Sequence, residues 1–290
     1  MKQIVFIVNP NSGIFSKDNI HEVISAHLDK NRFEYQVRYT EGPGHATELS
    51  KEWAGKGADV VVAVGGDGSV NEVARGLVFS TTSLGIIPAG SGNGLAHHLK
   101  IPLIRKKAIE VINIGNTKQI DTACMNEHLF VSIAGIGFDG KVARKFSQEG
   151  FRGFVAYLKV VTELYPGYKP KKYEIELNGQ KIVTKALFVA FANSDQFGFQ
   201  TSIAPNAKID DGLIDVAIVK KPQLIEIPFL AGLLFWRKID KSNHIQIFKT
   251  DDVLVKTKKN RWANLDGEPI KAGKELHVKV NPNSLNVIIP

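Results

Sequence analysis

Three glycine-rich turns in the first part of the chain each follow a short apolar run directly, and this pattern leaves few folds open. The runs are Gln3 to Val8, Asp59 to Val64 and Leu84 to Ile87, and the turns that follow them read NPNSG, GGDGS and GSGNG. Apolar residues at helical spacing come after the second turn, at Val70, Val73 and Leu77. Buried strands that alternate with helices predict a parallel sheet covered by helices on both faces.

Turns of this kind lie at the carboxyl ends of the strands, where open α/β sheets bind their ligands. Glycine lets the backbone approach a phosphate closely, and backbone N–H groups at a helix N-terminus supply positive potential. One such turn is usually only a turn, whereas three at one sheet edge indicate a phosphate site. The chain contains no G-x-x-x-x-G-K-[ST] sequence, so it is not a P-loop enzyme. Gly135 to Gly140 matches G-x-G-x-x-G, but no acidic residue ends a suitable second strand, so no nicotinamide site is expected.

The pattern changes after about Asp121 to a series of short strands, which predicts a second, β-rich domain. The expected strands are Leu129 to Ile133, Tyr173 to Leu177, Lys185 to Ala192, Leu213 to Val219, Ile245 to Phe248, Val253 to Lys256 and Leu276 to Val280. Asn178-Gly179 predicts a tight hairpin turn, and helices are expected near residues 140–166 and 222–237. We expect domains at residues 1–122 and 123–283, with a final strand at 284–290 that returns to the first domain.

Asp67 is the most informative polar residue, because it lies between glycines in the second turn. Its carboxylate could cap the following helix, or it could hold Mg²⁺ or accept a hydroxyl proton beside phosphates. Asn71 and Glu72 begin the next helix and could face the same pocket, although an acidic residue near a helix N-terminus is favourable in itself.

The motifs in combination resemble the catalytic domain shared by bacterial soluble diacylglycerol kinases, their relatives and sphingosine kinases. The sequences that carry the resemblance are NPNSG, GGDGSVNEVARGL, LGIIPAGSGNGLAHHLKIP, ANSDQFGFQTSIAPNAKIDDGLIDVAIV and LDGEP, in family order along essentially the whole chain. The resemblance implies an α/β domain like that of NAD kinases and lipid kinases and a β-sandwich-like lipid-substrate domain, with the nucleotide in the cleft between them. It also implies an enzyme that uses ATP and Mg²⁺.

The resemblance assigns roles to particular residues. Those expected at the nucleotide are Asn9, Pro10, Asn11, Ser12, Gly13, Thr40, Gly66, Asp67, Gly68, Ser69, Val70, Asn71, Glu72, Ser91 and Arg152. A metal ion is expected at the Asp211 carboxylate with the backbone carbonyls of Lys208 and Leu213, although Asp-Asp-Gly is also good turn chemistry. Asp139 is expected near the lipid headgroup, with a helix cap as the alternative, and Arg152 could equally be a solvated charge.

The general base is left open between two carboxylates. In the bacterial lipid kinases that the chain resembles, the glutamate of the LDGEP motif accepts the proton, which indicates Glu268 here. In sphingosine kinases the aspartate of the GGDG turn has this role, which indicates Asp67. Either choice suits phosphoryl transfer, because the reaction needs mainly positioning and charge neutralisation.

The formal net charge of +8 favours anionic partners. No nucleic-acid motif is present, so the expected partners are a membrane lipid and an anionic membrane surface, with a homodimer left open. Pro222 to Lys238 is apolar with basic ends, which is typical of a core helix or of an interfacial membrane element; Lys169, Lys171 and Lys172 could add attraction to that surface. One cysteine, Cys124, and an N-terminus that resembles a strand more than a signal peptide favour the cytoplasm.

We therefore expect a peripherally membrane-associated enzyme of phospholipid biosynthesis that phosphorylates diacylglycerol. The GSGN form of the third turn resembles the sphingosine kinase branch, so a sphingoid base or a phosphatidyl lipid stays open as the substrate. NAD kinase is the next alternative, but its glycine-rich substrate motif is missing from the second domain. A nucleotide-binding regulator without turnover is the nonenzymatic alternative.

Overall fold

A parallel sheet forms the framework of the first unit of the chain. The computed structural model describes residues 1–11, 19–149, 153–198 and 200–290. The chain divides into unit 1, Met1–Ile120 with Asn283–Pro290, and unit 2, Asp121–Pro282. The sheet of unit 1 has the order β2-β1-β3-β4, with every pair parallel, and the end of β16 joins the β4 edge through Val287 and Leu84. Its strands are β1 (Lys2–Val8), β2 (Phe33–Tyr39), β3 (Val60–Gly65), β4 (Ser83–Pro88) and the last residues of β16 (Glu268–Ile288).

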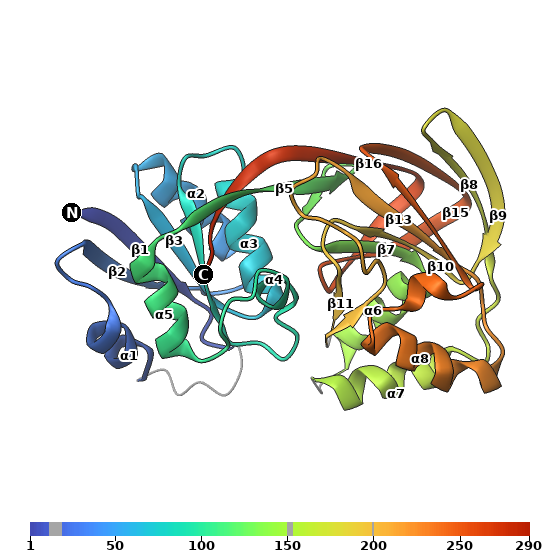
Figure 1. Ribbon diagram of the computed structural model, residues 1–290, viewed down its shortest axis with the longest axis horizontal. Helices are drawn as coiled ribbons and strands as arrows, with labels where there is room; N and C mark the ends of the chain where they lie inside the picture. Colours follow the sequence, from blue (N-terminus) through green and yellow to red (C-terminus); the bar gives the residue numbers. More distant parts are fainter. Residues whose placement is uncertain (12–18, 150–152, 199) are drawn as a thin grey trace. The chain divides into compact units, whose positions relative to one another are not determined.

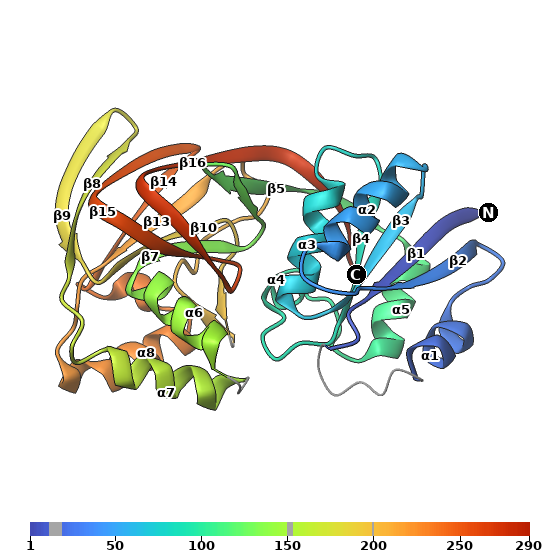
Figure 2. The ribbon, with the colours of Figure 1, turned by 180° about the vertical axis from the view of Figure 1, so that it is seen from behind.

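Helices cover both faces of this sheet, which explains why β3 is buried along its whole length. They are α1 (Asn19–His27), α2 (His45–Gly55), α3 (Asp67–Leu77), α4 (Gly94–His98) and α5 (Arg105–Ile114). α2 packs on α3 and α1 packs on α5, one pair on each face (Figures 1 and 2). The predicted α/β architecture of the first domain is confirmed.

The helix that follows the third glycine-rich turn is short. α4 ends at His98, and Lys100 has a φ of 58°, which a helix cannot contain. Pro102 follows, and a separate helix, α5, begins at Arg105. The sequence analysis named no helix for α4 or α5, and it missed β5 (Thr117–Met125), the strand that leads into unit 2.

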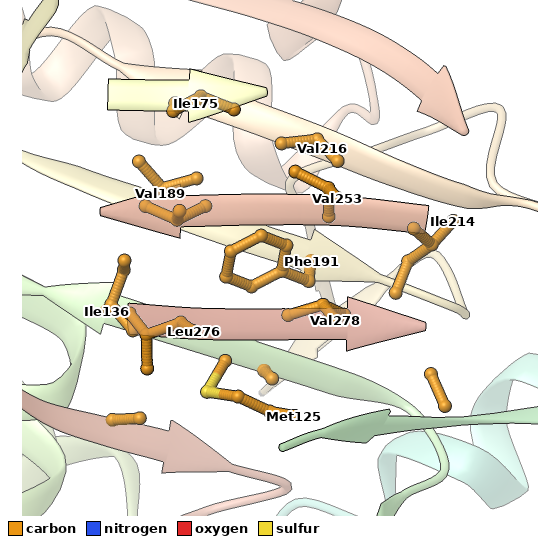
Figure 3. Close-up of a cluster of buried hydrophobic side chains, with 14 of the residues drawn as sticks. Met125, Ile136, Ile175, Val189, Phe191, Ile214, Val216, Val253, Leu276 and Val278 are labelled. Atoms are coloured by element: carbon orange, nitrogen blue, oxygen red, sulfur yellow. The ribbon is translucent and has the colours of Figure 1, made fainter. Parts of the chain in front are cut away.

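Unit 2 is built on a mainly antiparallel sheet in the order β14-β13-β10-β7-β15-β16, and β8 joins β15 to β9. The strands are β6 (His128–Phe130), β7 (Ile133–Gly137), β8 (Lys171–Leu177), β9 (Gln180–Ala186), β10 (Phe188–Ala192), β11 (Gln196–Gly198), β12 (Thr201–Ser202), β13 (Ile214–Val219), β14 (Ile245–Thr250), β15 (Asp252–Leu265) and β16. A buried cluster that includes Phe191, Val216 and Leu276 forms one core of the unit (Figure 3). The expected β-rich second domain is therefore present.

Helices cover the other face of this sheet over a second core. They are α6 (Phe138–Gln148), α7 (Phe154–Leu164) and α8 (Ile227–Phe235), with the 3₁₀ turns η1 (Leu224–Glu226) and η2 (Ile239–Lys241). The second core contains Val142 of α6, Val160 of α7 and Leu230 of α8. No helix within the described ranges is both long and apolar enough to span a bilayer.

Two strand boundaries in unit 2 have identifiable chemical causes, one local and one distant in the sequence. Asn178 and Gly179 have φ values of 48° and 71° and join β8 to β9 with Leu177 opposite Gln180, which confirms the predicted hairpin. The strand expected from Leu129 to Ile133 is instead divided, because β6 ends at Phe130 and β7 begins at Ile133. The backbone N–H groups of Val131, Ser132 and Ile133, which lie between the two strands and at the start of β7, donate to the Asp266 carboxylate.

Candidate active site

The second and third glycine-rich turns of unit 1 are in backbone contact. They follow β3 and β4, which are adjacent parallel strands. A Cβ atom placed on Gly90 would lie 2.5 Å from the Cα atom of Gly66. Glycine is therefore required at this crossing, and the two turns together form one surface at the carboxyl edge of the sheet.

Asp67 holds the third turn in place. Its Oδ1 accepts a hydrogen bond from the Gly94 N–H at 2.6 Å, and its Oδ2 accepts one from the Asn93 N–H at 2.8 Å. A Cβ on Gly92 would lie 2.5 Å from Asp67 Oδ2. Burial raises the pKa of Asp67, and the N–H donors of Gly94 and Asn93 lower it in part. The aspartate that the sequence singled out for chemistry thus also has a structural role.

Asn93 is a site residue that the sequence analysis quoted but did not select. Its side chain forms a closed pair of hydrogen bonds with Gly90, with Oδ1 accepting from the N–H at 2.9 Å and Nδ2 donating to the carbonyl at 2.7 Å. Its backbone has a φ of 52°, a conformation that asparagine tolerates better than most residues. The signal available in the sequence was the position of Asn93 between Gly92 and Gly94, which is typical of a tight turn. Ser91 lies exposed within this loop.

The first turn meets the beginning of α3. Asn9 Nδ2 donates to Ser69 Oγ at 3.1 Å, and Asn9 Oδ1 accepts from the Asn11 N–H at 2.9 Å. The Thr40 N–H donates to the carbonyl of Val8, so the end of β2 lies beside the same turn. The structure therefore brings together the predicted nucleotide residues Asn9, Pro10, Asn11, Thr40, Gly66, Asp67, Gly68, Ser69 and Ser91. Ser12 and Gly13 lie outside the described residues.

The remaining predicted nucleotide residues of α3 have other surroundings. Glu72 caps the start of α2, since its two carboxylate oxygens accept from the N–H groups of Gly44 at 2.9 Å and Ala46 at 3.1 Å. Val70 and Asn71 are buried within unit 1. The alternative reading of Glu72, a stabilising role at a helix N-terminus, is therefore the one supported by its contacts, although the helix it caps is α2 and not its own.

Within unit 2, Asp139 is enclosed in the first turn of α6. It is buried, and Asn264 Nδ2 lies 3.2 Å and 3.1 Å from its two carboxylate oxygens. Burial raises the pKa of Asp139 to about 6, and the Asn264 amide lowers it in part. The sequence analysis missed Asn264, because nothing in one sequence pairs an asparagine in β15 with an aspartate in α6.

The glycines of the Gly135-x-Gly137-x-x-Gly140 sequence serve packing around Asp139. A Cβ on Gly135 would lie 2.0 Å from Asp139 Oδ2, and a Cβ on Gly140 would lie 2.0 Å from the carbonyl oxygen of Trp262. Gly137 has a φ of 98°. Close approach of β7 to the Asp139 side chain therefore accounts for Gly135, close approach of α6 to β15 accounts for Gly140, and the positive φ accounts for Gly137.

The LDGEP sequence forms the tight turn between β15 and β16. Asp266 and Gly267 have φ values of 48° and 95°, and Leu265 pairs with Glu268 across the turn. The Asp266 carboxylate accepts three backbone N–H donors, from Val131 at 2.7 Å, Ser132 at 2.9 Å and Ile133 at 2.7 Å. Asn264 Oδ1 accepts from the Gly267 N–H at 2.9 Å, so one side chain links this turn to Asp139. Glu268 is thus the first residue of β16 on a firmly anchored hairpin.

The loop before β13 carries the three residues expected to bind metal. Asp211 Oδ1 accepts from the Leu213 N–H at 3.2 Å, and Asp211 Oδ2 lies 2.9 Å from Lys249 Nζ. Lys249 Nζ also lies 3.3 Å from Asp215 Oδ2. Lys249 and Asp215 both line a pocket of about 360 Å³. The buried Asp121 accepts from the Gly212 N–H at 2.7 Å and thereby fixes the loop.

The donor chemistry of this loop suits Mg²⁺, which prefers carboxylate and carbonyl oxygens. However, no group of three or more His, Cys, Asp and Glu side chains that could hold a metal is found among the described residues. Lys249 already provides a positive charge at the Asp211 carboxylate, so a divalent cation would have to share that oxygen or displace the ammonium group. Arg152, the remaining predicted ligand of the nucleotide, lies outside the described residues.

Comparison with known proteins identifies the family. Residues 3–125 match the diacylglycerol kinase catalytic domain, and residues 132–289 match the YegS C-terminal NAD kinase beta sandwich-like domain. The chain is 32% identical to a diacylglycerol kinase of Bacillus subtilis over 92% of this chain and 90% of the relative. It is 30% identical to a diacylglycerol kinase of Staphylococcus saprophyticus over 92% and 89%.

A crystal structure of a diacylglycerol kinase from Bacillus anthracis has the same fold, with a TM-score of 0.78 at 23% identity over 100% of this chain and 97% of that one. A second crystal structure from the same organism gives a TM-score of 0.82 at 24% identity, with the same coverage. These two structures establish the fold alone. Because both domain models match and the relatives align over nearly the whole chain, this protein belongs to the diacylglycerol kinase family of lipid kinases.

Proposed function

We propose that this protein transfers the terminal phosphoryl group of ATP, bound with Mg²⁺, to the hydroxyl group of diacylglycerol. The observation that carries the proposal is the crossing of the turns at Gly66 and Gly90, which Asp67 fixes through the N–H groups of Asn93 and Gly94. This places two glycine-rich backbones and the N-terminus of α3 at one edge of a parallel sheet. Such an edge suits the phosphates of a nucleotide. The relatives' printed name, diacylglycerol kinase, supports the choice of acceptor.

The transfer itself needs a proton acceptor near the lipid hydroxyl. The hydroxyl oxygen attacks the γ-phosphorus, the bond from that phosphorus to the β–γ bridging oxygen breaks, ADP leaves and the hydroxyl proton passes to a carboxylate. We assign this carboxylate to Glu268. Both oxygens of Asp67 already accept backbone N–H groups. Asp67 is better suited to holding the phosphate-binding turns in place.

Mg²⁺ would supply neutralisation of the phosphate charge when it is bound with ATP. A further Mg²⁺ could be held by Asp211 with the carbonyls of Lys208 and Leu213, in competition with the Lys249 ammonium group. The hard oxygen donors of this loop support the assignment. Asp139 is proposed to act near the polar end of the lipid as a buried group, tied through Asn264 to the turn that carries Glu268.

We place the reaction at the cytoplasmic surface of a membrane. The lipid acceptor is confined to a bilayer, and the net charge of +8 favours a surface that contains anionic lipids. The single cysteine, Cys124, is free, as expected for a protein of a reducing compartment. The product would be a phosphorylated lipid available to phospholipid synthesis.

The test is transfer of labelled phosphate from Mg-ATP to lipids in anionic vesicles, with diacylglycerol, sphingosine, phosphatidylglycerol and soluble NAD in parallel. The control is Glu268→Gln, which keeps the size of the side chain and removes the base. We expect product with diacylglycerol that falls by about a hundredfold or more in the variant, from the lower end of the range for a general base upward. Product only with sphingosine, phosphatidylglycerol or NAD would overturn the choice of acceptor. ATP binding without transfer to any acceptor would indicate a regulator.

A further inference from the structure

An exposed apolar surface lies on α7 and on the segment from η1 to Trp236. Fourteen large hydrophobic side chains are exposed among the described residues, and eight of them belong to these two short segments. Six define the surface that we call the apolar face: Val155 and Leu158 of α7, and Leu224, Ile225, Phe229 and Trp236 of the η1–α8 segment. Ile225 is 84% exposed, Val155 81% and Trp236 70%. A concentration of this kind marks an interaction surface.

The side of α8 that faces away from the core of unit 2 is also apolar. α8 contains no charged or hydrogen-bonding side chain from Ile227 to Phe235. One side, with Leu230 buried, packs in the second core of unit 2. The opposite side carries Phe229 and then Gly232, over which the Trp236 ring lies, with a Cβ on Gly232 3.4 Å from that ring. A helix that is apolar on all sides is typical of a fully nonpolar environment.

α7 and α8 present this surface together. The Phe154 ring at the start of α7 contacts the Phe235 ring at the end of α8, with centroids 6.3 Å apart and an interplanar angle of 79°. Both views of the ribbon show the two helices side by side (Figures 1 and 2). On their inner sides, Val160 of α7 and Leu230 of α8 belong to the same buried cluster. The two segments therefore form one surface on a shared core.

The charges at the edges of the apolar face are mainly positive. Lys159, Lys220, Lys238 and Lys241 are exposed, and the exposed acidic residues of the same region are Glu163 and Asp240. Glu226 is the acidic residue directly before α8. Its carboxylate accepts a hydrogen bond from the Gln223 N–H at 2.6 Å and lies 3.1 Å from His244 Nε2. An apolar surface with aromatic rings and a basic rim is the combination that binds the interface of an anionic bilayer.

We propose that the apolar face docks this protein on the surface of a bilayer that contains anionic lipids, with Ile225, Phe229 and Trp236 inserted between the headgroups. The inference deepens the proposed function, on which it rests for the choice of a lipid partner. A second copy of the chain is a less suitable occupant, because an isologous contact would bring two basic rims together. A lipid surface with negative headgroups instead offers the opposite charge around a nonpolar interior.

The experiment measures binding to vesicles without ATP and without diacylglycerol, so that docking can fail independently of the kinase reaction. The vesicles contain equal parts of phosphatidylcholine and phosphatidylglycerol, and vesicles of phosphatidylcholine alone serve for comparison. Trp236 is a natural reporter, because Trp53 is only 6% exposed and Trp262 is half-buried beneath Arg144 and Lys271. We expect a blue shift of tryptophan emission and cosedimentation with the anionic vesicles.

The test variant is Ile225→Ser/Phe229→Ser, and the matched control is Phe79→Ser/Leu103→Ser, which removes one aromatic and one aliphatic exposed side chain from unit 1. We expect at least about tenfold weaker vesicle binding for the test variant and unchanged binding for the control, since burying each such side chain in lipid is worth more than the roughly 1.4 kcal/mol of a tenfold change. Equal binding of the two variants would overturn the proposal. So would a test variant that binds vesicles normally but shifts from dimer to monomer in solution, which would assign the face to a second copy.

Activity on a short-chain diacylglycerol dispersed in water separates the two proposals. None of the substituted side chains belongs to the proposed catalytic or binding residues, so both variants should retain this activity while the test variant loses activity on vesicles. Activity in water without any vesicle binding by the wild type would refute the docking surface and leave the kinase assignment intact. If the wild type bound vesicles but had no kinase activity on vesicles or on the dispersed lipid, the docking surface would stand and the kinase assignment would be refuted.

Discussion

Charging Asp139 should destabilise the folded protein, and the structure indicates by how much. The residue is 5% exposed, and Asn264 is the side chain found hydrogen-bonded to its carboxyl group. Burial raises its pKa from 3.8 to about 6. Below pH 3.8 the carboxyl group is protonated in both the folded and the unfolded chain. As the pH rises, the unfolded chain loses this proton first, so the folded state loses relative stability until the pH passes about 6.

The magnitude follows from the difference between the two pKa values. That difference is about two pH units, and each unit corresponds to about 1.4 kcal/mol, so the loss approaches roughly 3 kcal/mol above pH 6. Asp139→Asn removes the ionisation and keeps the shape. Its amide oxygen can accept only one of the two contacts with Asn264, which costs about 1 kcal/mol at every pH. The variant should therefore be slightly less stable than the wild type near pH 4 and more stable at pH 8.

The assay is urea unfolding at a series of pH values from 4 to 8, with the free energy of unfolding compared between the wild type and Asp139→Asn. Asp251→Asn, which changes an exposed aspartate, is the control for the general effect of removing one negative charge. We expect the difference between the wild type and Asp139→Asn to change sign within this range and the control difference to stay nearly constant. A constant difference for Asp139→Asn would show that the buried carboxyl group keeps an ordinary pKa, and the reasoning from burial would be wrong.

Two further predictions concern the turn fixed by Asp67 and the loop that carries Asp211. Gly92→Ala would place a methyl group 2.5 Å from Asp67 Oδ2, so it should displace the third turn. We expect the ATP affinity, measured by calorimetry, to fall by about tenfold or more. Unchanged affinity would show that the turn is not part of the nucleotide site. Lys249→Met removes the ammonium group 2.9 Å from Asp211, so it should strengthen Mg²⁺ binding there, measured by calorimetry without nucleotide and by the Mg²⁺ dependence of the melting temperature. Equal Mg²⁺ affinity in both proteins would exclude competition between the lysine and the metal.

The sequence predicted the sheet of unit 1 well because its signals are local. Each buried strand is a continuous apolar run, and each glycine-rich turn is a short motif directly after it. The Asn178-Gly179 hairpin was predictable for the same reason, since both residues favour a positive φ. The boundaries that failed depend on distant groups. The division of the strand expected from Leu129 to Ile133 requires the Asp266 carboxylate, which lies far along the chain.

The candidate site was predictable in composition but only partly in roles. The sequence analysis selected Asp67 and Glu72 from their neighbours and Asp139 from the family resemblance, but it could not give their hydrogen-bond partners. Glu72 caps α2, a helix that precedes it in the chain. Asn264 was missed because it has no local motif and is significant only through its contacts with Asp139 and Gly267.

The aspartates of the two Asp-Gly motifs both accept backbone N–H groups, and this bears on which carboxylate acts in the reaction. Asp67 accepts two backbone N–H groups, and Asp266 accepts three. Each carboxylate thus fixes a tight turn, and removing it would leave backbone donors without their partner at a cost of about 1 to 3 kcal/mol each where they are buried. Loss of activity on substitution of either aspartate would therefore report a displaced turn as readily as a missing base. Glu268 follows the turn that Asp266 anchors and is the carboxylate proposed as the base, so Glu268→Gln is compared with the wild type in both activity and the free energy of unfolding.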